Sequence, residues 1–188
     1  MSYYLLECYA RNDGAVISIF PSLPDTFTTW MDGARFKFDI TEPFHFEIEE
    51  DDHGTMLPML DSSPLLITEE LLQALREAGV DNMDIYDTEI YDEVEDKIYT
   101  NYKAVNIIGM VSATDASQSK IRKVGDQQSG ILINWVDELV LDESRTRGLL
   151  MFRLAEKPSF IFVHDSVKNH LLKRGFDQLS FIPPEEVV

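Results

Sequence analysis

The sequence ITEELLQALREAGVDNMDI, residues 67–85, decides the fold of this 188-residue chain. An apolar run leads into Thr68, whose hydroxyl is suited to cap the first turn of an amphipathic helix. Gly79 comes directly after the last periodic position, where a left-handed residue commonly ends a helix. Residues 83–86 then alternate as a half-buried strand does. The stretch therefore predicts a strand–helix–Gly–strand unit.

A second stretch of the chain, VHDSVKNHLLKRGFDQLSF at residues 163–181, repeats this pattern 96 residues later. Asp165 or Ser166 is expected to cap its helix, Gly175 to end it, and residues 179–182 to form its last strand. Two units are too few for a solenoid, so they predict one sheet system covered by helices. The sequence alone leaves open whether the units share an origin or are alike by chance.

Further strands are predicted where apolar and polar residues alternate, namely at 3–9, 15–20, 36–40, 44–48, 99–111, 131–136, 138–141, 149–154 and 160–163. The turn residues 11–14 predict a hairpin between the first two strands. Residues 88–97 are acidic and are predicted to be a loop or a poor helix. The fold class is therefore α+β, strand-rich, with a mixed or antiparallel sheet. We expect a strand-rich part at 1–60 and an α+β part at 61–188, packed as one compact domain.

Net charge restricts the class of partner. Thirty-four acidic residues against sixteen basic ones give −18 and a pI near 4.4. Such a chain is unsuited to bind nucleic acid or an anionic membrane directly, but it suits a basic protein partner. Its single cysteine, Cys8, cannot form an internal disulfide, and no apolar run is long enough to span a bilayer. We expect a soluble cytoplasmic protein.

The acidic residues cluster at 47–52 and, in a longer run, at 84–96, where tyrosines lie among them. Clustered carboxylates beside aromatic side chains are typical of a surface that binds a basic partner. The predicted partner-binding residues are Tyr86, Asp87, Glu89, Tyr91, Asp92, Glu93 and Glu95. The alternative interpretation is a solvated acidic loop that only adds solubility.

Motifs for catalysis are sparse. Ser117 and Lys120 match a serine-x-x-lysine pattern, but the partner motifs that this pattern needs are missing. His45 and His53 flank the first acidic run, and they are more simply surface histidines than metal ligands. Trp30 and Trp135 are expected to pack in a core or an interface. We predict no catalytic residue, cofactor or metal ion.

Several short motifs occur together in a characteristic order: SPLLITE at 63–69, VNIIG at 105–109, SATD at 112–115, LDES at 141–144 and FRL at 152–154. This order resembles a bacterial immunity-protein family of polymorphic toxin systems, long known as a domain of unknown function in myxobacterial and many proteobacterial genomes. The resemblance covers about residues 35–183. The chain departs from the family pattern in its acidic segment at 88–97.

The resemblance implies a non-enzymatic protein that binds a cognate toxin and neutralises it, by covering the active site of the toxin. The charge of the chain favours a toxin with a basic surface. Two other interpretations stay open: a small hydrolase or transferase that uses Ser117 and Lys120, or acidic residues with His53, and an acidic adaptor with several partners. The sequence identifies neither the toxin nor the oligomeric state.

Overall fold

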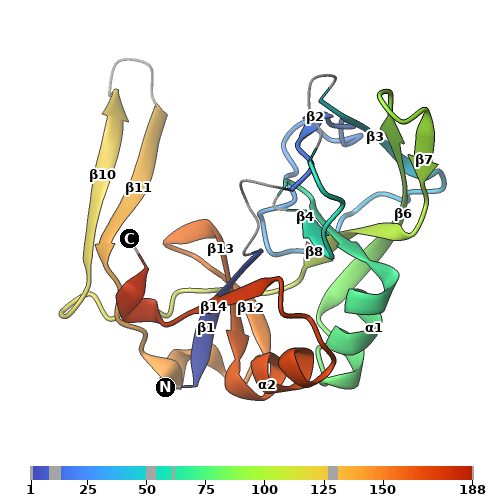
Figure 1. The fold of residues 1–188 in the computed structure, drawn as a ribbon. Coiled ribbons are helices and arrows are strands. Elements are labelled where there is room, and N and C mark those ends of the chain that lie inside the picture. Colours follow the sequence, from blue (N-terminus) through green and yellow to red (C-terminus); the bar gives the residue numbers. More distant parts are fainter. Residues whose placement is uncertain (1, 9–13, 50–53, 61, 127–130, 188) are drawn as a thin grey trace.

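Two strand–helix–strand units form the frame of the computed structural model, which describes residues 2–8, 14–49, 54–60, 62–126 and 131–187 (Figure 1). The first unit consists of β5 (Leu65–Thr68), α1 (Glu69–Glu77) and β6 (Met83–Asp92). The second consists of β13 (Lys157–His164), α2 (Asp165–Lys173) and β14 (Leu179–Ile182). Both predicted units are thus confirmed.

The ends of the two helices match the predicted signals, with one difference. Thr68 Oγ1 accepts a hydrogen bond from the Leu71 amide at 3.3 Å and caps α1. The cap of α2 is His164, whose Nδ1 accepts from the Ser166 amide at 3.2 Å, so the prediction of Asp165 or Ser166 was wrong by one or two positions. An imidazole nitrogen fills the role of the expected oxygen because it is also an acceptor.

The second unit lies in a five-stranded sheet with the order β14-β1-β13-β12-β9. Its other strands are β1 (Tyr3–Cys8), β12 (Met151–Leu154) and β9 (Met110–Val111). All neighbours are antiparallel except β12 and β9. Since β1 pairs with both β13 and β14, it separates the two strands of the unit.

The first unit lies in a seven-stranded sheet with the order β2-β3-β6-β8-β5-β4, in which β7 also pairs with β6. The added strands are β2 (Ile17–Ile19), β3 (Phe44–Ile48), β4 (Met59–Leu60), β7 (Lys97–Tyr99) and β8 (Tyr102–Ile107). Here β8 separates β5 from β6 and is antiparallel to both. The two units therefore share one topology: parallel outer strands with a third strand between them.

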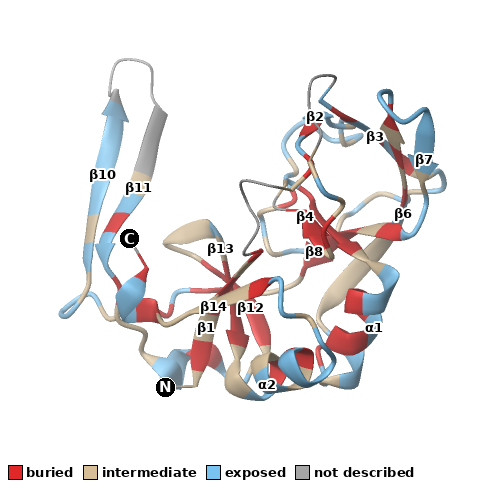
Figure 2. Ribbon diagram, in the orientation of Figure 1, coloured by how far each residue is buried: buried red, intermediate tan, exposed pale blue. Residues whose placement is uncertain are grey.

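Helices α1 and α2 of the two units lie side by side and contact each other. Glu77 of α1 forms ion pairs with Arg174, which comes directly after α2, and with His170 of α2, the latter at 3.4 Å. The inner faces of both helices are buried (Figure 2). The main core joins both sheets, with fully buried side chains such as Leu66, Leu75 and Leu171.

A second, smaller core covers the opposite face of the five-stranded sheet, where Tyr3, Phe152 and Phe162 pack against Val136 and Leu139. The last two residues flank the base of a ribbon formed by β10 (Lys120–Asp126) and β11 (Ile131–Glu138), which projects from the body (Figure 1). Two short 3-10 helices, η1 (Glu143–Thr146) and η2 (Pro184–Glu186), complete the described structure.

Five local predictions were wrong. Residues 138–141 form no separate strand, because Glu138 ends β11 and Leu141 makes only an isolated bridge with Thr114. Residues 36–40 form no strand, and Phe36 instead stacks on Tyr86 of β6 and packs edge-on against Trp30 at the border of the main core. The hairpin between residues 3–9 and 15–20 is not formed, since both sides of β1 are occupied by β13 and β14. The predicted turn at 11–13 lies outside the described residues. The predicted strand at 99–111 is divided among β7, β8 and β9. In the segment 88–97, predicted as loop or helix, residues 88–92 are the end of β6 and only residues 93–96 form a turn.

An acidic face on the first sheet

Strand β6 distributes the predicted partner-binding residues over two faces, because successive side chains in a strand point to opposite sides. The described burial matches this alternation: Thr88, Ile90 and Asp92 are buried, whereas Asp87 is exposed and Glu89 is half-exposed. Tyr91 lies on the same side as Asp87 and Glu89. Three of the seven predicted residues therefore share the outer face of the sheet.

The side chains of Tyr86 and Asp92 point to the inner face. Tyr86 packs edge-on against Trp30 and Phe44, and burial raises the pKa of its phenol. Asp92 is only 9% exposed, and its carboxylate accepts a hydrogen bond from the Glu95 amide at 3.0 Å. Tyr86 therefore belongs to an aromatic cluster at the core, and Asp92 supports the turn that follows β6. Trp30, as predicted, is a core residue, whereas Trp135 is 47% exposed.

Glu93 and Glu95 lie in the turn between β6 and β7 and are exposed. The turn requires a left-handed residue at Asp96, whose φ is +46°. Partial burial and the carboxylates of Asp96 and Glu93 raise the pKa of the Tyr91 phenol, so this hydroxyl remains a donor at neutral pH. The hairpin therefore presents carboxylates around a protonated tyrosine.

Sheet pairing brings further residues to this face that sequence reasoning missed. Strand β3 runs parallel to β6 and places His45 beside Glu89, with Nδ1 and Oε2 at 3.1 Å. The same register puts Glu47 beside Tyr91. From β7, Ile98 lies opposite Tyr91 and is 56% exposed. The outer face thus has an exposed aliphatic side chain, Ile98, with carboxylates near it.

One lysine compensates part of this charge. Lys103 Nζ lies 2.9 Å from Asp87 Oδ1 and 2.9 Å from Glu69 Oε1, and its side chain is only 17% exposed. Burial by itself would lower the pKa of Lys103, but the hydrogen bonds that it donates to these two carboxylates outweigh this effect and raise the pKa. Lys103 is therefore charged at neutral pH and holds Asp87 at the edge of the acidic face.

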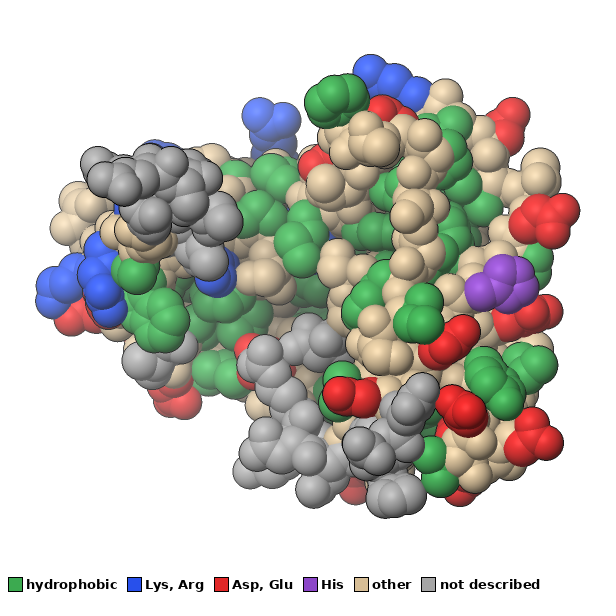
Figure 3. Space-filling model, turned by 90° about the horizontal axis from the view of Figure 1, so that it is seen from above, with side chains coloured by type: hydrophobic (Ala, Val, Ile, Leu, Met, Phe, Trp, Pro, Cys, Tyr) green, Lys and Arg blue, Asp and Glu red, His purple; other side chains and the backbone are tan. Residues whose placement is uncertain are grey.

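The charge of the chain is divided unevenly between its two halves. Residues 1–107, up to the end of β8, contain 23 Asp and Glu against 6 Lys and Arg, whereas residues 108–188 contain 11 against 10. The first half thus has a formal charge of −17 and the second −1. In Figure 3 acidic side chains gather on the right, on the side where Figure 1 places β6 and β7. Lys and Arg side chains are more frequent near the ribbon, on the left.

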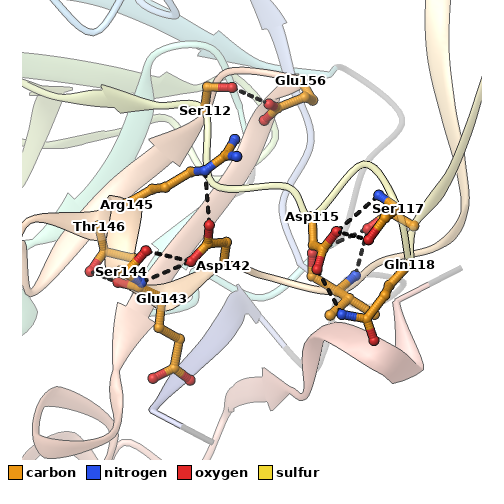
Figure 4. A network of polar contacts seen from close by, with 12 residues as sticks. Ser112, Asp115, Ser117, Gln118, Asp142, Glu143, Ser144, Arg145, Thr146 and Glu156 are labelled. Atoms are coloured by element: carbon orange, nitrogen blue, oxygen red, sulfur yellow. Dashed lines mark hydrogen bonds and ion pairs between the residues drawn. The ribbon is translucent and has the colours of Figure 1, made fainter.

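The serine-x-x-lysine pattern does not form a joined pair. Ser117 Oγ donates to Asp115 Oδ1 at 2.6 Å, in a turn where Gln118 Nε2 also donates to Asp115 (Figure 4). These bonds lower the pKa of Asp115 to about 2. Lys120 Nζ instead pairs with Glu138 across the ribbon, at 2.5 Å. The described hydrogen bonds thus place Ser117 in a turn and Lys120 in a ribbon contact.

The described ranges contain neither a metal-binding cluster nor a membrane-spanning helix. No three His, Cys, Asp or Glu side chains within them are grouped so as to hold a metal ion. His53 lies outside these ranges. Neither described α-helix has the length and apolar character needed to cross a bilayer.

An extended and exposed charged face on a rigid sheet is a surface suited to protein recognition. A comparison with family models agrees with a role in protein recognition. The chain belongs to the Immunity protein family (Imm11), whose model matches residues 2–186. The resemblance seen in the sequence is thereby confirmed, and it extends over nearly the whole chain. A comparison with curated proteins found no match.

Proposed function

We propose that this immunity protein binds a cognate toxin and neutralises it, without chemistry of its own, by covering the active site of the toxin with the acidic face of β6. The observation that carries the proposal is the charge of −17 in the half that bears this face. Membership of an immunity family supplies the class of partner. We further propose that it acts in the cytoplasm of the cell that it protects.

The outward residues of the face are the proposed contacts. They are Asp87, Glu89 and Tyr91 of β6 with Glu93 and Glu95 of the turn, together with their neighbours Glu47, His45 and Ile98. Carboxylates at the rim speed the encounter with a basic partner by roughly 10- to 1000-fold at low salt. Desolvated apolar side chains near the centre of an interface slow its dissociation. The face has both features.

A basic surface on the toxin follows from charge complementarity. A toxin that acts on nucleic acid has a basic cleft, because it must neutralise phosphates. Carboxylates of the acidic face would take the places of those phosphates. Nanomolar to picomolar affinity, on the order of −12 to −16 kcal/mol, is the range that lasting neutralisation requires.

The test is to co-express the chain with the product of the neighbouring toxin gene and to measure co-purification, affinity and protection of cells. We expect a single tight partner, with 1:1 binding that weakens as salt rises. An acidic adaptor would instead bind several proteins weakly. Growth arrest by the toxin despite the presence of this chain would refute the proposal.

A further inference from the structure

A second polar site lies far in sequence from the acidic face, in the near-neutral half of the chain. A pocket of about 320 Å³ opens between the segment before β10, the base of the ribbon, η1 and the turn from β12 to β13. Its polar lining consists of Ser112, Thr114, Ser119, Asn134, Arg145 and Glu156. The residues come from four separate segments, so the fold, and not one local motif, builds this pocket.

Two acceptor atoms at the pocket have no partner among the described residues. Ser112 Oγ donates to Glu156 Oε1 at 2.5 Å, but the other carboxylate oxygen, Oε2, is buried and receives no hydrogen bond (Figure 4). Thr114 is 5% exposed, and its hydroxyl is likewise unpaired. A buried polar atom without a partner is unfavourable, so both atoms favour a ligand that donates hydrogen bonds.

The position of Glu156 is fixed by hydrogen bonds to its backbone and to its side chain. Asn134 Nδ2 donates to the Glu156 carbonyl oxygen at 2.5 Å and so ties the β12–β13 turn to the ribbon. Together with the bond from Ser112, this contact holds the carboxylate at the pocket from two sides. A ligand would therefore meet a preorganised acceptor, which lowers the entropic cost of binding.

Charge around the pocket favours a cation. The charged side chains that line the pocket are Arg145 and Glu156. The Arg145 charge is compensated by Asp142, with Nε and Oδ2 at 2.9 Å. Hydrogen bonds from Ser144 lower the pKa of Asp142, so this partner stays ionised at neutral pH. Glu156 has no ion pair within the described part of the chain and is left as the uncompensated acidic side chain of the pocket.

We propose that this pocket receives a lysine or arginine side chain of the partner protein, held by the carboxylate of Glu156 and the hydroxyl of Thr114. A guanidinium group fits the site best because it donates in a fork to both oxygens of a carboxylate. The inference rests on the proposed function for the identity of the partner, which is the toxin. It adds a second contact, separate from the acidic face of β6.

The pocket is tested first with methylguanidinium as a probe and with tetramethylammonium as a control cation that lacks donors. We expect methylguanidinium to shift the backbone amide resonances of Thr114 and Glu156 saturably, and tetramethylammonium to leave them unchanged. Glu156→Gln should weaken binding of the probe roughly tenfold, since a charge-assisted hydrogen bond is about twice as strong as a neutral one. Glu138→Gln, on the ribbon but outside the pocket lining, is the matched control. Unchanged resonances, or an unchanged affinity in Glu156→Gln, would overturn the assignment.

Thr114→Val separates binding from folding. Replacing a buried, unpaired hydroxyl by a methyl group of the same shape is expected to keep or raise the unfolding temperature, because an unsatisfied polar atom is removed. The same variant should bind methylguanidinium more weakly and release the toxin roughly threefold faster or more, since one hydrogen bond is lost. A Thr114→Val protein that holds both ligands as the wild type does would refute the proposal. If the wild-type chain binds no toxin, the proposed function fails, while the methylguanidinium experiment still decides the pocket.

Discussion

The two strand–helix–strand units have the same topology but differ in the strand that comes after each helix. In the first unit β6 runs for ten residues and continues through a turn into β7. In the second unit β14 runs for four residues and ends before Pro183. The extra length of β6 carries the acidic residues, and its half of the chain holds nearly all of the net charge. The topology that the two units share builds the core. The extension of β6, which the second unit lacks, carries the surface that we propose for binding.

The largest expected effect tests the shared frame. Leu75 and Leu171 occupy equivalent positions of α1 and α2 and are 1% and 0% exposed. Leu75→Ala and Leu171→Ala should each lower the free energy of unfolding by about 2–5 kcal/mol, because each leaves a cavity in the main core. Urea denaturation of the two variants measures this. A large cost in one half and almost none in the other would break the equivalence of the units.

The next effect concerns the acidic face alone. Ile98→Ala should release the toxin roughly tenfold faster if Ile98 is one of the few central anchors of the interface, whose truncation costs more than about 1 kcal/mol. Leu172→Ala is the control, because Leu172 is also an exposed aliphatic residue, at 47% against 56% for Ile98, but lies on α2. Surface plasmon resonance gives both dissociation rates. Equal rates for the two variants would remove Ile98 from the interface.

The helix-ending glycines offer a finer comparison of the two units. Gly79 and Gly175 have φ of +93° and +87°, which an alanine adopts only with strain. A Cβ on Gly79 would also lie 3.2 Å from Leu150 Cδ1, whereas none would crowd Gly175. We expect Gly175→Ala to cost about 1 kcal/mol of unfolding free energy and Gly79→Ala clearly more. Thermal unfolding that ranks them in the opposite order would contradict the described contacts.

The smallest effect is a pH dependence in the near-neutral half. The folded pKa of Asp115 is depressed to about 2 from an ordinary 3.8, chiefly by the hydrogen bond from Ser117. Its stabilising contribution is therefore present above pH 3.8 and is lost as the pH falls toward 2. Ser117→Ala should move the pKa of Asp115 toward its ordinary value, as a carboxylate carbon NMR titration would show. An unmoved titration would mean that the turn does not depend on the Ser117 hydroxyl.

The parts of the fold that are local in sequence were predictable. Helix periodicity, the Thr68 cap and the two glycines identified both units. The strand character of residues 88–92 was missed because Asp and Glu are disfavoured in strands. Its buried positions, Thr88 and Ile90, alternate with acids that tolerate the outer face.

Contacts between distant segments were not predictable from one sequence. His45 and Glu47 reach the acidic face only through the parallel pairing of β3 with β6. Ser112 and Glu156 are 44 residues apart and meet at a turn. No periodicity encodes such contacts, because they depend on the order of strands in the sheet.

The central claim is that the acidic half steers the toxin, and matched charge reversals test it most directly. One triple variant reverses Glu89, Glu93 and Glu95 to Lys on the acidic face, and the other reverses the exposed Asp177, Glu185 and Glu186. Both change the net charge equally, and association rates are measured by stopped flow between low and moderate salt. We predict roughly tenfold or greater slowing of association for the first variant at low salt, a difference that salt diminishes, and near wild-type association for the second. Equal association rates for the two variants would contradict the account.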